Sequence, residues 1–320
     1  MNQALFEPAT GTIVGIRGQW LLQFNATTGA FIQAMRFSDD AAGVSCMTIL
    51  NGKIYCGVLF SPITDYAAGN SAGRDIFVVD AATFALASRF NLGSISQTVD
   101  SEIQAGYRML TNNGTRIAGF TYTQGSTPQD TVGDFEFDPT DIAGTFQRAS
   151  YSTFAEDSSY DSVNGVYWIP DAGGSRIECK QSPFGGSDCR STSGLITSHG
   201  ITYNSDQNKV FCVLGDESFV EVNASDAVPA FSDFPFTTRH TGRINCNAIR
   251  VKSVNGQSGN AHNGKVLIPT WADDAVVIWD PATNAVESVQ TGFTAPFDIV
   301  VCPTANWAVQ SGVVGLKEIT

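Results

Sequence analysis

The chain has 320 residues, of which 42% are hydrophobic and only 15% charged, and its net charge is −13 at pH 7. This acidic balance argues against nonspecific nucleic-acid binding, which needs a cationic surface that releases counterions, and disfavours an anionic membrane surface. No stretch approaches the roughly 18 apolar residues of a membrane span, so no membrane insertion is expected.

The first residues, MNQALFEPATG, contain neither a basic nor a long apolar region. They do not match a secretory signal peptide. We therefore expect a soluble protein without a signal peptide, located in the cytoplasm or in a virion.

Paired hairpins follow one another along the chain. "ALFEPATGTIVGIRG" starts at Ala4, and "WLLQFNATTGAFIQAMRF" follows at Trp20. Later pairs start at Ser45 and Ile76, Tyr107 and Asp134, Tyr160 and Arg176, Gly200 and Phe219, and Cys246 and Val276. In the pair from Cys246, "CNAIRV" is the expected first strand, and a longer loop joins it to "GKVLIPTWAD". The Asn51-Gly52, Asn113-Gly114 and Asn164-Gly165 pairs predict tight turns.

The second hairpin of each pair has a turn residue at its centre, as in "VVIWDPATNAVESV". Asp, Asn and Pro favour turns because they fix φ or bond to nearby backbone. The anchors recur every 42 to 58 residues, and they are Asn25, Asp80, Asp138, Gln181, Asn223 and Asp280. Periods of roughly 40–50 residues are typical of propeller blades.

Two hairpins per repeat give four short strands, and a seventh repeat begins at Phe297. The sequence therefore predicts an all-β fold, a β-propeller of seven four-stranded antiparallel blades, with residues 1–320 as a single domain. Six blades plus an extra hairpin is the alternative. Because adjacent blades cover both faces of a strand, second-strand residues of either parity are expected in the core. They are Ile54, Tyr55, Val166, Trp168, Val210, Phe211, Val266 and Ile268.

The rhythm of strands and turns resembles that of NHL-type, YVTN-type and gluconolactonase-like propellers over most of the chain. Trp279-Asp280 matches a WD dipeptide, but no Gly-His precedes it and the other repeats lack it. The resemblance implies the fold and does not specify an activity.

Seven cysteines occur in the chain, and most fall within predicted strands. We interpret them as small buried apolar residues. Cys179 and Cys189 face each other across one hairpin, so a disulfide there is the alternative. Without a CxxC pair, a zinc site is disfavoured. The seven are Cys46, Cys56, Cys179, Cys189, Cys212, Cys246 and Cys302.

Acidic residues gather in the loops between second and third strands and in the links between blades, which lie on one face of a propeller. Converging carboxylates there would bind Ca²⁺ or another divalent cation. The alternative is that Asp favours turns and solvent, in which case no cofactor is bound. The candidate ligands are Asp40, Glu102, Asp157, Asp171, Asp216 and Asp273.

The chain contains no GxSxG, HExxH, Walker or dinucleotide-binding motif, so no catalytic or cofactor-binding residues are assigned. The last repeat offers three strands, "FDIVVC", "WAVQS" and "VVGLKEI". Its final strand would be an open edge, which pairs with other chains unless it is protected. Lys317 and Glu318 are charges of the protective kind. The candidate partner-binding residues are Val313, Val314, Leu316 and Ile319.

Three classes of function compete. The first is a non-enzymatic structural or protein-binding propeller with a protein partner or neighbouring subunits; its Lys-poor, Asn-, Thr-, Ser- and Gly-rich composition suits a tailed-phage virion component. The second is a metal-dependent hydrolase resembling gluconolactonases, whose Glu-Gly-Pro opening is missing here. The third is a carbohydrate-binding propeller using Trp20, Trp168, Trp271 and Trp279 as stacking platforms. The sequence favours the first class.

Overall fold

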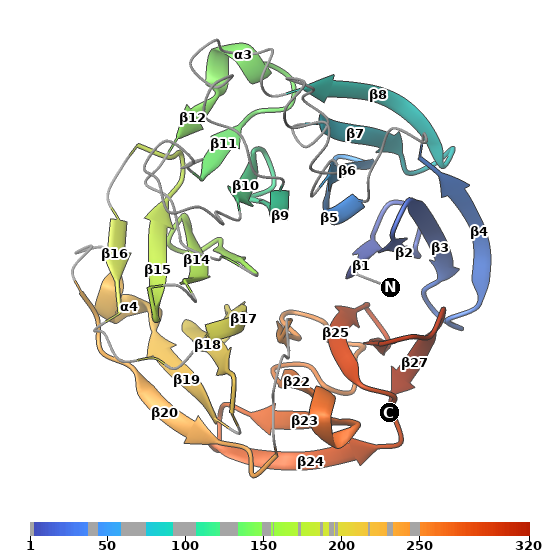
Figure 1. Cartoon of the computed structure of the whole chain (residues 1–320). Coiled ribbons are helices and arrows are strands. Elements are labelled where there is room, and N and C mark those ends of the chain that lie inside the picture. Colours follow the sequence, from blue (N-terminus) through green and yellow to red (C-terminus); the bar gives the residue numbers. More distant parts are fainter. Residues whose placement is uncertain are drawn as a thin grey trace, which may run out of the picture.

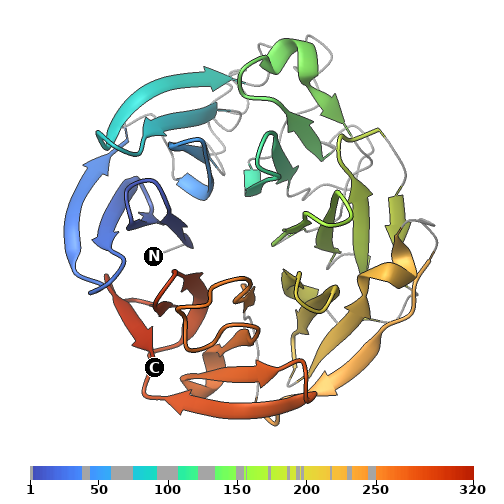
Figure 2. The same ribbon diagram turned by 180° about the vertical axis from the view of Figure 1, so that it is seen from behind.

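The computed structural model places seven small antiparallel sheets in a ring around a common axis (Figures 1 and 2). It describes residues 3–37, 44–58, 75–91, 107–121, 134–148, 155, 157–171, 174–185, 188–191, 195, 198–216, 218–228, 233–243 and 250–320. Each sheet is one blade, and its strands run in chain order from the axis outward.

Blade 1 has β1 (Gln3–Glu7), β2 (Thr12–Arg17), β3 (Trp20–Asn25) and β4 (Phe31–Arg36). Blade 2 has β5 (Val44–Leu50), β6 (Lys53–Val58), β7 (Asp75–Asp80) and β8 (Ala85–Asn91). Blade 3 has β9 (Tyr107–Asn112), β10 (Ile117–Thr121), β11 (Phe135–Phe137) and β12 (Gln147–Arg148), with α3 (Ile142–Thr145) between its last two strands. Blade 4 has β13 (Ser159–Asp161), β14 (Val166–Asp171), β15 (Arg176–Gln181) and β16 (Asp188–Arg190).

Blade 5 has β17 (Ser198–Asn204), β18 (Lys209–Leu214), β19 (Ser218–Asn223) and β20 (Thr237–His240), with α4 (Ala224–Ala227) after β19. Blade 6 has β21 (Lys252–Ser253), β22 (Val266–Thr270), β23 (Ala275–Asp280) and β24 (Ala285–Thr291), with the 3₁₀ turn η4 (Trp271–Asp273) between β22 and β23. Blade 7 has three strands, β25 (Pro296–Val301), β26 (Asn306–Gln310) and β27 (Leu316–Ile319). In the described part of the chain, no helix is long and apolar enough to cross a membrane.

The predicted seven-bladed all-β propeller is confirmed, and the six-bladed alternative is wrong. One boundary differs. Residues 246–249 of "CNAIRV" lie outside the described residues, Arg250 and Val251 are not in a strand, and β21 begins directly after them. Among the described residues its ladder has two residue pairs, Lys252 with Leu267 and Ser253 with Val266.

The turn anchors act as the sequence suggested. The side chains of Asn25, Asp80, Asp138 and Asp280 accept hydrogen bonds from backbone N–H groups two or three residues later, at 2.8–2.9 Å. These bonds hold the hairpin turn with local chemistry alone. Four of the six anchors therefore hold their own turns, whereas the Asn223 side chain makes no cap hydrogen bond at α4.

The core lies between neighbouring blades. All eight predicted second-strand residues are buried, with at most 8% of their surface exposed. Cys46, Cys56, Cys179, Cys212 and Cys302 are also buried, and burial raises the thiol pKa of Cys46 and of Cys302 to about 12. Cys179 and Cys189 lie opposite each other on the neighbouring strands β15 and β16. The Cys189 side chain and Cys246 lie outside the described residues, so the disulfide between Cys179 and Cys189 stays a prediction.

Polar side chains of the inner strands link consecutive blades. At four blade junctions, an inner-strand or adjacent side chain accepts a hydrogen bond from a backbone N–H of the next blade, and the junction of blades 4 and 5 has a second such bond, from the Tyr203 N–H to the Ser159 Oγ at 2.9 Å. The pairs are Asp298 with Ala4, Gln3 with Met47, Asp157 with Ile201, and Thr202 with Ser253, at 2.7–3.1 Å. Because each bond satisfies a buried donor, it fixes the angular position of one blade against the next.

A buried ion pair links blades 3 and 4. The Lys180 amine lies 2.7 Å from Asp134 and 3.3 Å from Glu178, and all three residues are at most 1% exposed. A buried charge is tolerated only when it is paired and hydrogen-bonded. This cluster therefore depends on all three members.

Blade 1 meets blade 7 without sharing a strand. β1 pairs with β2, so the N-terminal residues do not form the fourth strand of blade 7. The Trp307 indole Nε1 of blade 7 donates to the Ala26 carbonyl of blade 1 at 2.9 Å. The same ring lies so close to Gly29 that a Cβ there would be 2.5 Å away. A side-chain seam therefore closes the ring.

Candidate functional site

Four of the six predicted acidic ligands lie in the described part of the chain, and Asp40 and Glu102 lie outside it. Asp171 ends β14, and Asp216 and Asp273 lie between the second and third strands of their blades. Asp157 precedes β13. All four therefore occupy the two kinds of connection expected on one face.

Two of these acids have structural partners. Asp157 is fully buried, and burial raises its carboxyl pKa, although Lys252 and Arg250 act in the opposite direction. Asp171 is also fully buried; it accepts from the Gly174 N–H at 2.9 Å and lies 3.1 Å from the Arg176 Nε.

Asp216 accepts from the Ser218 N–H at 2.7 Å, as a turn residue does. Within the described ranges, no three His, Cys, Asp or Glu side chains gather into a set that could hold a metal ion. The cation site stays a prediction.

The second candidate site is the outer edge of blade 7. Over the described residues, β27 pairs only with β26, so its other edge carries backbone N–H and C=O groups without a ladder partner. Val313 and Val314, just before the strand, are 39% and 51% exposed. Leu316 is half-buried, and Ile319 is buried in the core between blades 6 and 7. Ile319 can therefore offer a partner its backbone and not its side chain.

The face of blade 1 next to this edge is apolar. Leu22 and Phe24 of β3 pack in the core shared with blade 7. By strand register, Phe31 lies opposite Phe24, and Ala34 lies opposite Leu22, so these β4 residues point the same way. Trp20 and Phe31 are nevertheless 45% and 57% exposed, and Ile32 is 48% exposed. The outer strand of blade 1 thus presents an apolar face where a fourth strand of blade 7 would lie.

A hollow of about 580 Å³ lies at this place. Val314 of blade 7 forms one side, and Trp20, Leu22, Phe31 and Ala34 of blade 1 form the other. Arg17 at the end of β2 and the turn at 18–19 complete the lining. Sequence reasoning found the blade 7 half and missed the blade 1 half. The available signal was the apolar "FI" at the start of an outer strand, next to a blade that is one strand short.

No protein-family model matches the chain, and no curated protein matches it in sequence. Solved structures do share its architecture. The β-propeller domain of Myceliophteria thermophila Cps50 (Swd1) aligns with 100% of this chain and 96% of that chain, at 10% identity and a TM-score of 0.67. A chain in the crystal structure of the Mitotic Checkpoint Complex aligns with 99% of this chain and 86% of that chain, at 11% identity and a TM-score of 0.71. At such identities the likeness shows the fold alone.

Proposed function

We propose that this protein is a non-enzymatic, protein-binding β-propeller that takes an extended segment of a protein partner as the fourth strand of blade 7. The observation that carries this proposal is the open edge of β27 beside the exposed apolar face of β4. A strand edge that no neighbouring strand covers can pair with another chain. Strand addition supplies main-chain hydrogen bonds, and the pockets for alternate side chains supply specificity.

The chemistry of the segment follows from its two faces. Side chains of an added strand alternate between the hollow and the opposite face. Those facing blade 1 would cover Trp20, Phe31 and Ala34, so they are expected to be apolar. The net charge of −13 favours a segment with basic flanks, because the field of the whole protein attracts them. The alignment with a chain of the Mitotic Checkpoint Complex is consistent with a propeller that works inside an assembly.

Of the carbohydrate-stacking tryptophans, Trp168 and Trp279 are buried between blades, which leaves Trp20 and Trp271 exposed. This burial favours the protein-binding class over the lectin class. The finer proposal, that the assembly is a tailed-phage virion, rests on composition. Mass spectrometry of purified particles from the source tests it, and absence of the protein from those particles would remove it.

Site-directed photo-crosslinking tests the binding edge. A benzophenone amino acid at position 314 should capture a partner through one extended segment. The same group at position 163 should not, because Val163 is 64% exposed on a turn of blade 4, away from the edge. A synthetic peptide of the captured segment should then bind the purified protein.

Phe31→Asp should weaken the affinity for that peptide by at least about tenfold, because it places a charge among buried apolar contacts. Val163→Asp is the matched control and should leave affinity unchanged. Equal capture from both positions would contradict the proposal, and so would a peptide that binds the Phe31→Asp variant as tightly as the parent.

A further inference from the structure

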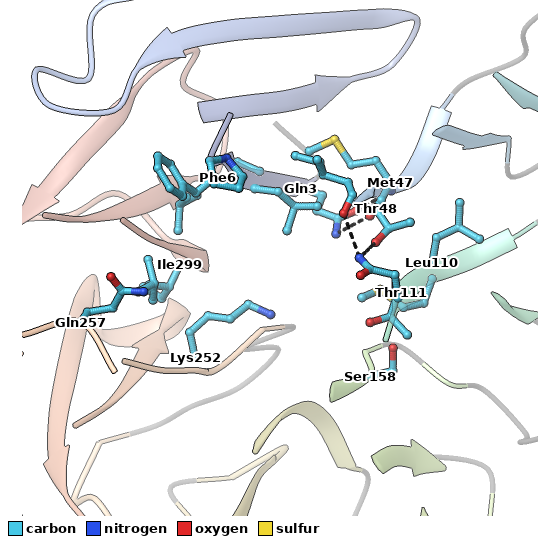
Figure 3. A pocket seen from close by; sticks show the side chains of 18 of the residues that line it. Gln3, Phe6, Met47, Thr48, Leu110, Thr111, Ser158, Lys252, Gln257 and Ile299 are labelled. Carbon is cyan, nitrogen blue, oxygen red and sulfur yellow. Dashed lines mark hydrogen bonds between the residues drawn. The ribbon is translucent and has the colours of Figure 1, made fainter. Parts of the chain in front are cut away.

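The inner strands of the ring enclose a second cavity, separate from the outer hollow (Figure 3). Its volume is about 550 Å³, within the range of small-molecule pockets. Strands β1, β5, β9 and β25 form most of its wall, and Gln257 and Pro303 extend it to turns between first and second strands. Phe6, Leu110 and Ile299 make much of this wall apolar.

One charged side chain faces this cavity. Of the described residues that line it, Lys252 alone is charged. Its side chain extends from β21 into the cavity in Figure 3. No described acid lies within ion-pair distance of its amine.

The neighbouring charges do not neutralise this amine by contact. Asp157 interacts with Lys252 through space, but it is fully buried, bonds the Ile201 N–H and does not line the cavity. Burial also raises the pKa of the Asp157 carboxyl, which weakens its role as a counter-charge. Arg250 lies 3.6 Å from Asp298, so that acid already has a cationic neighbour.

Hydroxyl and amide side chains make up the rest of the polar wall. The Ser158 Oγ is buried, the residue is 5% exposed, and among the described residues this oxygen has no hydrogen-bond partner. Ser158 and Thr111 both line the cavity, on the side toward which the Lys252 amine points in Figure 3. A buried hydroxyl without a partner costs free energy that a bound acceptor recovers. The Lys252 amine thus points across the cavity toward an unpartnered hydroxyl donor, in a wall that also contains Gln3, Thr48, Asn112 and Gln257.

We propose that this cavity binds a small organic carboxylate. The carboxylate accepts from the Lys252 amine and the Ser158 hydroxyl, and the hydrocarbon part packs against Phe6, Leu110 and Ile299. Small-molecule sites usually combine a mainly apolar wall with a few polar groups that orient the ligand. The site lies inside the ring and does not depend on the proposed binding edge of blade 7.

Isothermal titration calorimetry with matched ligands tests the proposal. The probes are hexanoate, octanoate, benzoate and 3-phenylpropionate, each compared with its neutral amide, and with chloride and phosphate. At least one carboxylate should bind the parent protein, and its amide should bind at least about tenfold more weakly, because charged hydrogen bonds are the stronger ones. This comparison needs no variant and so survives a variant that fails to fold.

Variants then locate the site. Lys252→Met keeps an unbranched side chain of similar length without the charge, and it should weaken the affinity for the carboxylate by about tenfold or more. Ser158→Ala should weaken it by a smaller factor. Lys53→Met, at a partly exposed ion pair in blade 2 and away from the cavity, is the matched control and should have no effect on carboxylate affinity. Failure of all four carboxylates to bind, equal affinity for the amides, equal binding of inorganic anions, or unchanged affinity of a folded Lys252→Met variant would each overturn the proposal.

Discussion

Two buried tryptophans that differ in one hydrogen bond give a direct test of how the ring is closed. Trp307 is 4% exposed, and its Nε1 donates to the Ala26 carbonyl at 2.9 Å across the seam between blades 7 and 1. Trp279 is 3% exposed, and its Nε1 has no partner among the described residues. Trp→Phe at either position removes the same atoms and leaves an aromatic ring, so loss of volume largely cancels in the comparison.

The hydrogen bond then decides the difference. Trp307→Phe leaves the Ala26 carbonyl without its donor, in a residue only 7% exposed, at a cost of about 1–3 kcal/mol beyond the lost volume. Trp279→Phe instead removes a buried N–H that is already unpaired. The free energy recovered by removing this N–H offsets part of the free energy lost with the smaller side-chain volume. The free energy of unfolding should therefore fall further for Trp307→Phe, by at least about 2 kcal/mol.

Urea unfolding followed by circular dichroism measures both variants, with the slopes compared to confirm that the same surface is exposed. Hydrogen exchange adds the location. Blades 1 and 7 should exchange faster in Trp307→Phe, whereas Trp279→Phe should loosen the core around Phe219, whose ring lies 4.8 Å away. The reasoning is refuted if Trp279→Phe loses as much stability as Trp307→Phe, or if the seam exchanges no faster in the latter.

Three further predictions concern stability. Lys180→Met should cost about 3–5 kcal/mol, because it takes the Lys180 amine away from the buried Asp134 carboxylate, whereas Glu178 keeps Arg176. The control Lys53→Met, at a partly exposed pair, should change the free energy of unfolding by no more than about 1 kcal/mol, and similar losses would contradict the argument. Gly29→Ala should lower the thermal midpoint more than Gly52→Ala, because both glycines have positive φ but only a Cβ at Gly29 would clash with the Trp307 indole. Equal midpoints for the two variants would show that the indole moves aside without cost. Burial lowers the pKa of His262 below its ordinary 6.5, so the unfolded chain binds the proton more tightly and stability should fall as pH drops below about 6.5. His262→Gln should therefore lessen the change in urea midpoint between pH 7.5 and 5.5. An unchanged pH dependence of the urea midpoint in this variant would refute the reasoning.

The fold could be read from the sequence because its signals are local and repeated. Anchors such as Asn25 and Asp280 bond to backbone only two or three residues away, so their turns do not depend on the rest of the ring. In the second strands, consecutive residues point to opposite faces of the blade, and both sets are apolar because neighbouring blades cover both faces. Chemistry within a few residues, repeated along the chain, was therefore sufficient to indicate the architecture. The one shifted strand, β21, is the shortest kind of ladder, with two residue pairs.

The candidate sites depended on the closed ring. Asp157 and Asp216 have similar sequence surroundings as loop acids, yet one is fully buried against a backbone N–H of the next blade and the other caps its own turn. Trp20 and Val314 come from opposite ends of the chain and share a hollow only because blade 7 packs against blade 1.

Lys252 had no signal in the sequence that set it apart from other lysines. Its place at the inner cavity follows from which strand is innermost and from which acids are already occupied by other partners. Repeated local chemistry thus determined the blades, because turns and strand faces are settled within each repeat. Only the tertiary structure decided which side chains meet, because those contacts join residues that the ring brings together from distant repeats.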